Sequence, residues 1–327
     1  MALEAQYWEA REDGRVLCKL CPQACLLKDG QKGLCRSRAC DHGKMQLLNY
    51  GKTIAFSLDP IEKKPLYHFH PGSQILSLGP NSCNLQCSFC QNYQISQMDQ
   101  ETRDISPEQL LQFLSARALT QVAFTYTEPL TWFEYILDFA ALASDIDIVL
   151  VTNGFLNPEP FHEISRVTTA MNIDLKSIRP GFYKDECHGM LETVLDNISW
   201  ASKSGIHLEL TNLLIPGLND SLEDISALIN FCASLSEDTI LHFSAYHPAY
   251  RQTRPATPFK TVLQACELAR AKLNYVYAGN ITAKAYQDTL CPNCGRKLIQ
   301  RTGWKTVSEV QNTGCCPSCS FKTKGVF

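Results

Sequence analysis

Short apolar runs alternate with segments of helical periodicity through the middle of the chain. The apolar runs, rich in β-branched and aromatic residues, lie at 75–78, 122–126, 147–151, 171–175, 207–214 and 240–246. Between and after them, apolar positions recur with helical spacing at 107–118, 131–144, 159–168, 191–204, 222–235 and 259–273. This alternation predicts an α/β fold whose parallel strands are joined by right-handed helical crossovers. Six such repeats fit an open, partial (β/α)6 TIM-like barrel best.

The pattern also divides the chain. Residues 75–280 hold the expected barrel, and residues 59–74, rich in Pro, His and Lys without either period, read as a linker or lid. Residues 1–58 form a cysteine-rich module whose stretch from 45 to 58 predicts a hairpin turning at Gly51. Residues 281–327 form a second small cysteine module.

The loop after the first apolar run carries Cys83, Cys87 and Cys90, with Phe89 directly before the third cysteine. A four-iron cluster held entirely by protein needs four thiolates, so three suggest that one iron is open to another ligand. The alternatives are an incomplete zinc site or three buried thiols. Structural zinc takes four ligands in paired knuckles, and Cys-x3-Cys is a poor knuckle. The spacing therefore favours a [4Fe-4S] cluster.

This spacing resembles the radical S-adenosylmethionine (radical SAM) signature. The resemblance implies that the open iron chelates the amine and carboxylate of S-adenosylmethionine and that Phe89 lies beside the adenine. It also implies the chemistry, in which one electron from the cluster cleaves the sulfonium and the 5′-deoxyadenosyl radical removes a hydrogen atom from a substrate.

Polar residues follow the expected strands, where ligands of parallel sheets bind. These strand ends lie at 125–129, 152–154, 174–176, 216–220 and 246–248. Their hydroxyl, carboxylate, amide, ammonium and imidazole groups suit a zwitterionic ligand that carries a ribose. A carboxylate there can pair with an ammonium group, and a lysine with a carboxylate.

Similarity to glycyl-radical-activating enzymes implies roles for six of these residues. Glu128 takes the place of the acidic residue of a Gly-Gly-Glu motif that meets the methionyl amine, although Tyr126 and Thr127 replace the two glycines. The remaining cofactor-binding candidates match a Thr-Asn-Gly strand end, an Asp-x-Lys motif and a ribose-contacting histidine: Thr152, Asn153, Asp174, Lys176 and His247. Cys187, on the same rim, is either a functional thiol or inert filler.

The N-terminal module offers four thiolates in a glycine-containing segment. Cys18 and Cys21 form a knuckle, and Cys25 and Cys35 supply further ligands. Zinc or an auxiliary iron-sulfur cluster fits such a set, and unligated buried cysteines are the third alternative. Cys40 is the expected bystander, although it could replace Cys35.

The C-terminal tail contains two Cys-Pro-x-Cys knuckles. One holds Cys291 and Cys294, and the other holds Cys316 and Cys319. Paired knuckles at this separation predict a zinc ribbon, with a rubredoxin-like iron site as the alternative. Cys315 adjoins the second knuckle but breaks the pattern.

Composition narrows the function classes. The 327 residues include 45% hydrophobic and 19% charged residues, with a net charge of −3, so no basic field for nucleic acid or anionic membrane is expected. The first twenty residues lack an apolar export segment, and no run approaches the roughly 18 apolar residues of a membrane span. With these features, the 16 cysteines indicate metal sites in the reducing cytoplasm rather than disulfides.

Nearly the whole chain resembles the AmmeMemoRadiSam-system radical SAM enzymes, which are similar to pyruvate-formate-lyase-activating enzymes. The resemblance includes CNLQCSFCQN, FTYTEPLTWFEY, LLIPGLND, YAGN and both cysteine modules. It implies a radical SAM enzyme with an unidentified substrate, an electron donor such as flavodoxin or ferredoxin, and Memo-like and AMMECR-like proteins as partners. The alternatives are a glycyl-radical activase and a non-catalytic iron-sulfur and zinc scaffold.

Overall fold

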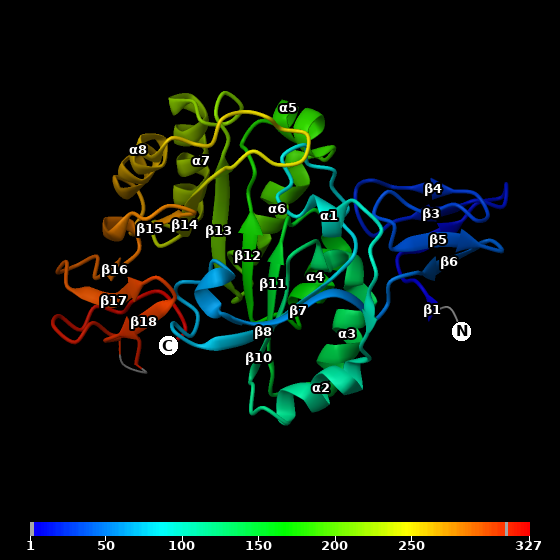
Figure 1. The fold of residues 1–327 in the computed structure, drawn as a ribbon, viewed down its shortest axis with the longest axis horizontal. Coiled ribbons are helices and arrows are strands. Elements are labelled where there is room, and N and C mark those ends of the chain that lie inside the picture. Colours follow the sequence, from blue (N-terminus) through cyan, green and yellow to red (C-terminus); the bar gives the residue numbers. More distant parts are fainter. Residues whose placement is uncertain (1–2, 311–312) are drawn as a thin grey trace.

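A computed structural model describes residues 3–310 and 313–327, with a nine-stranded sheet at its centre (Figure 1). Seven neighbouring strands run parallel, and their order across the sheet follows their order in the chain. They are β8 (Gln74–Pro80), β10 (Gln121–Phe124), β11 (Asp147–Thr152), β12 (Ala170–Asp174), β13 (His207–Leu214), β14 (Ile240–Ala245) and β15 (Tyr275–Gly279). The antiparallel strands β7 (Lys52–Pro60) and β9 (Arg103–Asp104) extend the sheet beyond β8.

The six expected helices are all present and connect the parallel strands. They are α2 (Pro107–Ser115), α3 (Phe133–Leu142), α4 (Pro158–Ser165), α6 (Leu191–Ala201), α7 (Leu222–Leu235) and α8 (Phe259–Arg270). Among the described helices, none has the combined length and apolarity needed to cross a bilayer. The α/β class and the open parallel sheet predicted from the sequence are confirmed, but β15 adds a parallel strand that the repeat pattern missed. Its five residues are too few for a clear period beside α8.

The two faces of the sheet have different coverings because strand side chains alternate. In β10, Val122 and Phe124 belong to the large core that includes the helices. Ala123 faces the other way and packs with Leu66 and Phe69. Residues 59–74, expected as a linker or lid, therefore include a segment that fills the inner face of the sheet.

A buried carboxylate fixes this inner segment. Glu209 on β13 accepts hydrogen bonds from the backbone N–H groups of Tyr67, at 3.0 Å, and His68, at 2.7 Å. The imidazoles of His207 and His242 contact the same carboxylate at 2.9 and 2.6 Å. Burial opposes ionisation, but the two histidine hydrogen bonds hold the pKa of Glu209 well below its usual range. The charge is thus compensated within the fold.

The N-terminal module consists of two three-stranded sheets. One contains β2 (Trp8–Ala10), β3 (Val16–Cys18) and β4 (Leu26–Leu27), and the other contains β1 (Leu3–Glu4), β5 (Arg38–Asp41) and β6 (Lys44–Leu47). The hairpin expected over 45–58 is not formed, because β6 pairs with β5 whereas β7 pairs with β8. Gly51 lies in the turn between β6 and β7, which belongs to the central sheet. Its φ is +66°, and there is no space for a Cβ beside the carbonyl of Ile105.

The C-terminal module is a three-stranded sheet of β16 (Thr289–Leu290), β17 (Lys297–Thr302) and β18 (Lys305–Ser308). Arg301 on β17 is buried, and its guanidinium donates to the carbonyl of Tyr67 in the inner segment and to the hydroxyl of Thr289. The shorter helices are η1 (Ile61–Lys63), α1 (Tyr93–Ser96), η2 (Pro129–Trp132), α5 (Pro180–Phe182), η3 (Tyr183–Cys187) and η4 (Lys284–Tyr286).

Replacement of Gly79 at the end of β8 tests how closely the strands approach. A Cβ there would lie 2.0 Å from the carbonyl oxygen of Thr125, so Gly79→Ala must force two strand ends apart. We expect the free energy of unfolding to fall by roughly 1–3 kcal/mol in chemical denaturation. Gly181→Ala is the matched control, because a Cβ at Gly181 meets no atom within 4 Å. Equal stability of the two variants would contradict this close approach.

Candidate active site

A cavity of about 550 Å³ lies at the carboxyl ends of the parallel strands. This volume is in the range of small-molecule sites, about 300–1,000 Å³. Eight of the residues predicted from the sequence line it: Cys83, Cys87, Cys90, Glu128, Thr152, Asn153, Asp174 and Lys176. Phe89, which the sequence resemblance places beside the adenine, also lines it. His247 is exposed and is not among the lining residues.

The loop between β8 and α1 brings the three cysteines to the cavity. Backbone N–H groups of Gln86 and Ser88 donate to the carbonyls of Cys187 and Glu186, at 2.9 and 2.8 Å. The loop is therefore fixed against the segment that follows β12. Hydrogen-bond partners also surround the sulfur atoms, since Asn153 Nδ2 lies 3.8 Å from Cys83 Sγ. Ser96 Oγ lies 3.2 Å from Cys90 Sγ.

The spacing of these three thiols suits a cluster rather than one ion. Among the described residues, Cys83, Cys87 and Cys90 do not form a group whose three sulfur atoms all lie within 4.8 Å of one another. Burial raises the pKa of Cys83, and a hydrogen bond with Cys187 together with burial raises that of Cys87. A metal centre would therefore have to hold them as thiolates, as iron-sulfur clusters do.

Glu128 joins the ends of β10 and β11. Its Oε1 accepts from the backbone N–H of Leu130 at 3.0 Å and from the hydroxyl of Thr152 at 2.6 Å. Its Oε2 accepts from the backbone N–H of Asn153 at 2.8 Å. A carboxylate offers about four acceptor positions, so one on Oε2 is left for a ligand ammonium group. Burial raises the pKa of Glu128 to about 7, against the effect of these hydrogen bonds.

The second charged pair comes from the end of β12. Lys176 Nζ lies 3.0 Å from Asp174 Oδ2. Burial alone would favour the neutral amine, but the Asp174 carboxylate raises the pKa of Lys176 well above its usual value. The backbone carbonyl of Lys176 accepts hydrogen bonds from Asn212 Nδ2 at 3.2 Å and from Asn219 Nδ2 at 2.7 Å. The lysine is therefore a fixed, charged group in the cavity.

The structure adds Lys64 to the cavity lining and shows contacts of the strand-end residue Tyr126 that the sequence did not predict. Tyr126 adopts φ of +70°, a conformation that favours glycine, at a position where the activase motif has glycine. Its hydroxyl donates to Asp59 at 2.5 Å, and Lys64 Nζ lies 4.4 Å from its ring centroid. Lys64 also pairs with Asp59 at 2.7 Å. Tyr126 meets Asp59 and Lys64 because residues 59–65 pack against the sheet. No period in the sequence predicts this packing.

Asn84 does not line this cavity but supports its edge, and the sequence prediction missed it although its position directly after Cys83 is a usable signal. Its Oδ1 accepts from Asn153 Nδ2 at 2.9 Å, and its Nδ2 donates to the carbonyl of Phe155 at 2.6 Å. These bonds connect the cysteine loop to the end of β11. Cys187, in contrast, is fully buried and does not line the cavity.

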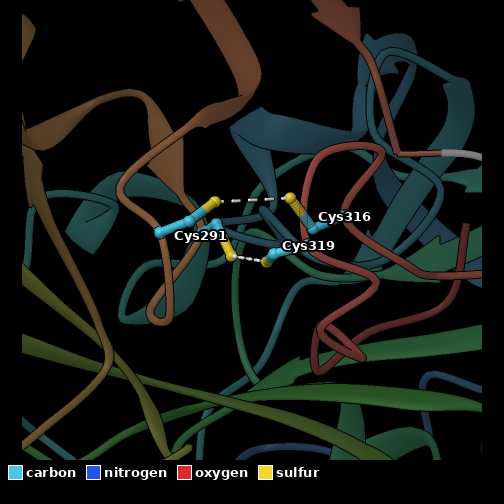
Figure 2. Close-up of side chains that lie close together, drawn as sticks. Cys291, Cys316 and Cys319 are labelled. Atoms are coloured by element: carbon cyan, nitrogen blue, oxygen red, sulfur yellow. Dashed lines mark hydrogen bonds between the residues drawn. The ribbon is translucent and has the colours of Figure 1, made fainter.

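The four C-terminal thiols form a compact group (Figure 2). Cys291 Sγ lies 3.5 Å from Cys319 Sγ, and Cys294 Sγ lies 3.7 Å from Cys316 Sγ. Tetrahedral ligation at about 2.3 Å places sulfurs about 3.8 Å apart, so one zinc or iron ion fits. Hydrogen bonds from the Asn293 side chain and the Phe321 backbone lower the pKa of Cys319 to about 6. The N-terminal cysteines Cys18, Cys21, Cys25 and Cys35 line a separate small cavity.

Comparisons with known proteins agree with this site. The family model of the Radical SAM superfamily matches residues 79–232. Uncharacterized protein MJ0808 of Methanocaldococcus jannaschii is 39% identical over 306 residues, which cover 91% of each sequence. A radical SAM methyltransferase from Sphaerobacter thermophilus shares the fold, with 15% identity, a TM-score of 0.51 and coverage of 64% of this chain and 67% of that one.

SuiB of Streptococcus suis, in its structure bound to S-adenosylmethionine, has 13% identity and a TM-score of 0.50, with coverage of 61% of this chain and 48% of that one. At such identities the two solved structures show a common fold alone. The superfamily match and the site define the class at the level of a domain, so residues 79–232 of the chain form a radical SAM domain. The chain belongs to one family with Uncharacterized protein MJ0808.

Glu128→Gln tests the buried carboxyl through the pH dependence of stability. A pKa raised from 4.5 to about 7 means that the folded protein binds this proton more tightly than the unfolded chain. The stabilisation is therefore present below pH 4.5 and is lost as pH rises through 7. We expect the wild-type stability relative to Glu128→Gln to fall by about 2–3 kcal/mol between pH 5 and 8. If the difference in free energy of unfolding between the two proteins does not vary with pH, the pKa of Glu128 is not raised in the folded protein.

Cys316→Ser tests the C-terminal metal site. We expect it to lower the bound zinc or iron by about one ion per chain in elemental analysis, because one tetrahedral ligand is lost. Cys315→Ser is the matched control, since Cys315 lies outside the compact group. The same loss in both variants, or no loss in either, would argue against a site at these four thiols.

Proposed function

We propose that this protein is a radical SAM enzyme that cleaves S-adenosylmethionine reductively at a [4Fe-4S] cluster and acts on a substrate not yet identified. The observation that carries the proposal is the meeting of Cys83, Cys87 and Cys90 with Glu128 and Lys176 at one cavity. The loop supplies three thiols and no fourth cysteine. This number suits a four-iron cluster with one open iron. A scaffold without catalysis would not need opposite charges in that cavity.

The lining residues fit both groups of the cofactor. The three loop thiols would hold the cluster, and the free acceptor position of Glu128 would receive the methionyl ammonium group. Lys176 would pair with the methionyl carboxylate, and Asp174, Thr152 and Asn153 offer polar contacts at the same edge. When bound, the cluster and S-adenosylmethionine together supply one-electron cleavage and a carbon radical.

The proposal extends to the surroundings of the enzyme. A flavodoxin or ferredoxin would serve as electron donor, and Memo-like and AMMECR-like proteins would be partners in a cytoplasmic system. The sequence resemblance is the support for these partners.

The direct test is anaerobic reconstitution with iron and sulfide, followed by incubation with S-adenosylmethionine and dithionite. We expect 5′-deoxyadenosine and methionine from the wild type, quantified by liquid chromatography and mass spectrometry. Cys90→Ala is expected to lower the yield of 5′-deoxyadenosine by roughly 100-fold or more, because the cluster loses one of its three thiolate ligands. Cys232→Ala is the control, because Cys232 is buried in α7 away from the cavity.

Failure of the reconstituted wild type to form 5′-deoxyadenosine would contradict the proposal. So would equal product from Cys90→Ala and the wild type. In either case, a non-catalytic iron-sulfur and zinc scaffold would become the better account of the cysteine groups.

A further inference from the structure

The N-terminal cysteines surround a second, much smaller cavity. Cys18 ends β3, Cys21 and Cys25 lie in the loop before β4, and Cys35 precedes β5. All four line this cavity, whereas Cys40 does not. The backbone N–H of Cys18 donates to the carbonyl of Cys25 at 2.9 Å, which holds two members of the group together. The four cysteines thus surround a single cavity.

The spacing of this N-terminal group differs from that of the C-terminal group in the same molecule. In the part of the chain that the structure describes, no three of its sulfurs lie within 4.8 Å of one another. The C-terminal sulfurs pair at 3.5 and 3.7 Å. The N-terminal cavity has a volume of about 20 Å³, enough for a water molecule. Four sulfurs at about 2.3 Å from a zinc ion would leave no such space.

Arg38 supplies an independent sign of an anionic occupant. Its side chain is 1% exposed and lines the cavity. One guanidinium nitrogen donates to Glu134 Oε1 and another to the carbonyl of Gln6, both at 2.6 Å. Its Nε–H has no hydrogen-bond partner among residues 3–310 and 313–327. A buried, unsatisfied charged donor is costly, and a group with acceptor sulfurs in the cavity would satisfy it.

We infer that Cys18, Cys21, Cys25 and Cys35 hold an iron-sulfur cluster rather than a zinc ion, with Arg38 Nε–H donating to one of its sulfurs. Four thiolates are the complete ligand set of a two-iron or four-iron cluster. Such a cluster has no open iron for a substrate. Asn84 lines this cavity as well, and its sequence neighbour Cys83 lines the proposed active site.

The test uses full-length protein with Cys83→Ala, Cys87→Ala and Cys90→Ala combined, purified and reconstituted anaerobically. We expect about two to four irons per chain, with an equal amount of acid-labile sulfide, in addition to the ion of the C-terminal site. Adding Cys18→Ser and Cys25→Ser should abolish the sulfide. Adding Cys40→Ala instead should leave it unchanged, because Cys40 lies outside the cavity.

A triple variant that contains no sulfide, with or without a second zinc ion, would overturn the inference. Because this variant lacks the proposed radical cluster, its result is independent of S-adenosylmethionine cleavage. If the triple variant does not fold, wild type and Cys18→Ser/Cys25→Ser are compared by iron and sulfide analysis and Mössbauer spectroscopy. Equal cluster content in these two proteins would overturn the inference as well.

Discussion

The carboxyl ends of parallel strands meet at one edge of the sheet, and the rest of the site depends on this geometry. β8 leads into the cysteine loop, β10 into Glu128, β11 into Asn153 and β12 into Lys176. These residues are distant in sequence, but strand register brings them to one cavity. Gly79 permits the closest approach, because no side chain fits between it and the carbonyl of Thr125.

Each buried charge in the centre of the molecule has partners that fix its position. Glu209 on the inner face accepts hydrogen bonds from the segment that packs into the sheet, whereas Glu128 keeps one acceptor position free. The first arrangement holds the segment on the inner face of the sheet, and all four acceptor positions of Glu209 are occupied without a ligand. The second leaves capacity for one. Lys176 and Asp174 add a charged pair in the cavity at the carboxyl ends of the strands. The charged groups available to a ligand therefore line the same cavity as the three loop cysteines.

The sequence predicted the parallel sheet, its helices, and the three cysteines and the charged residues Glu128, Asp174 and Lys176 of the cavity, because these depend on local periods, on motif spacing and on strand ends. Residues 59–74 show where such reasoning stops. Their place against Ala123, and the contacts of Lys64 and Tyr126, depend on tertiary packing that leaves no period in the sequence. The prediction of a hairpin over 45–58 was wrong for a similar reason, because β6 pairs with β5 and β7 pairs with β8 in two different sheets. The role of His247 stays a prediction, as it lies outside the cavity lining.

Electron-nuclear double resonance tests the central claim most directly. The reduced, reconstituted protein would be mixed with S-adenosylmethionine labelled with ¹⁵N at the amine and ¹⁷O at the carboxylate. A cluster held by Cys83, Cys87 and Cys90 with one open iron predicts hyperfine coupling from both labels. A cluster signal without coupling from either label would mean that its iron is closed to the cofactor, and would contradict this account.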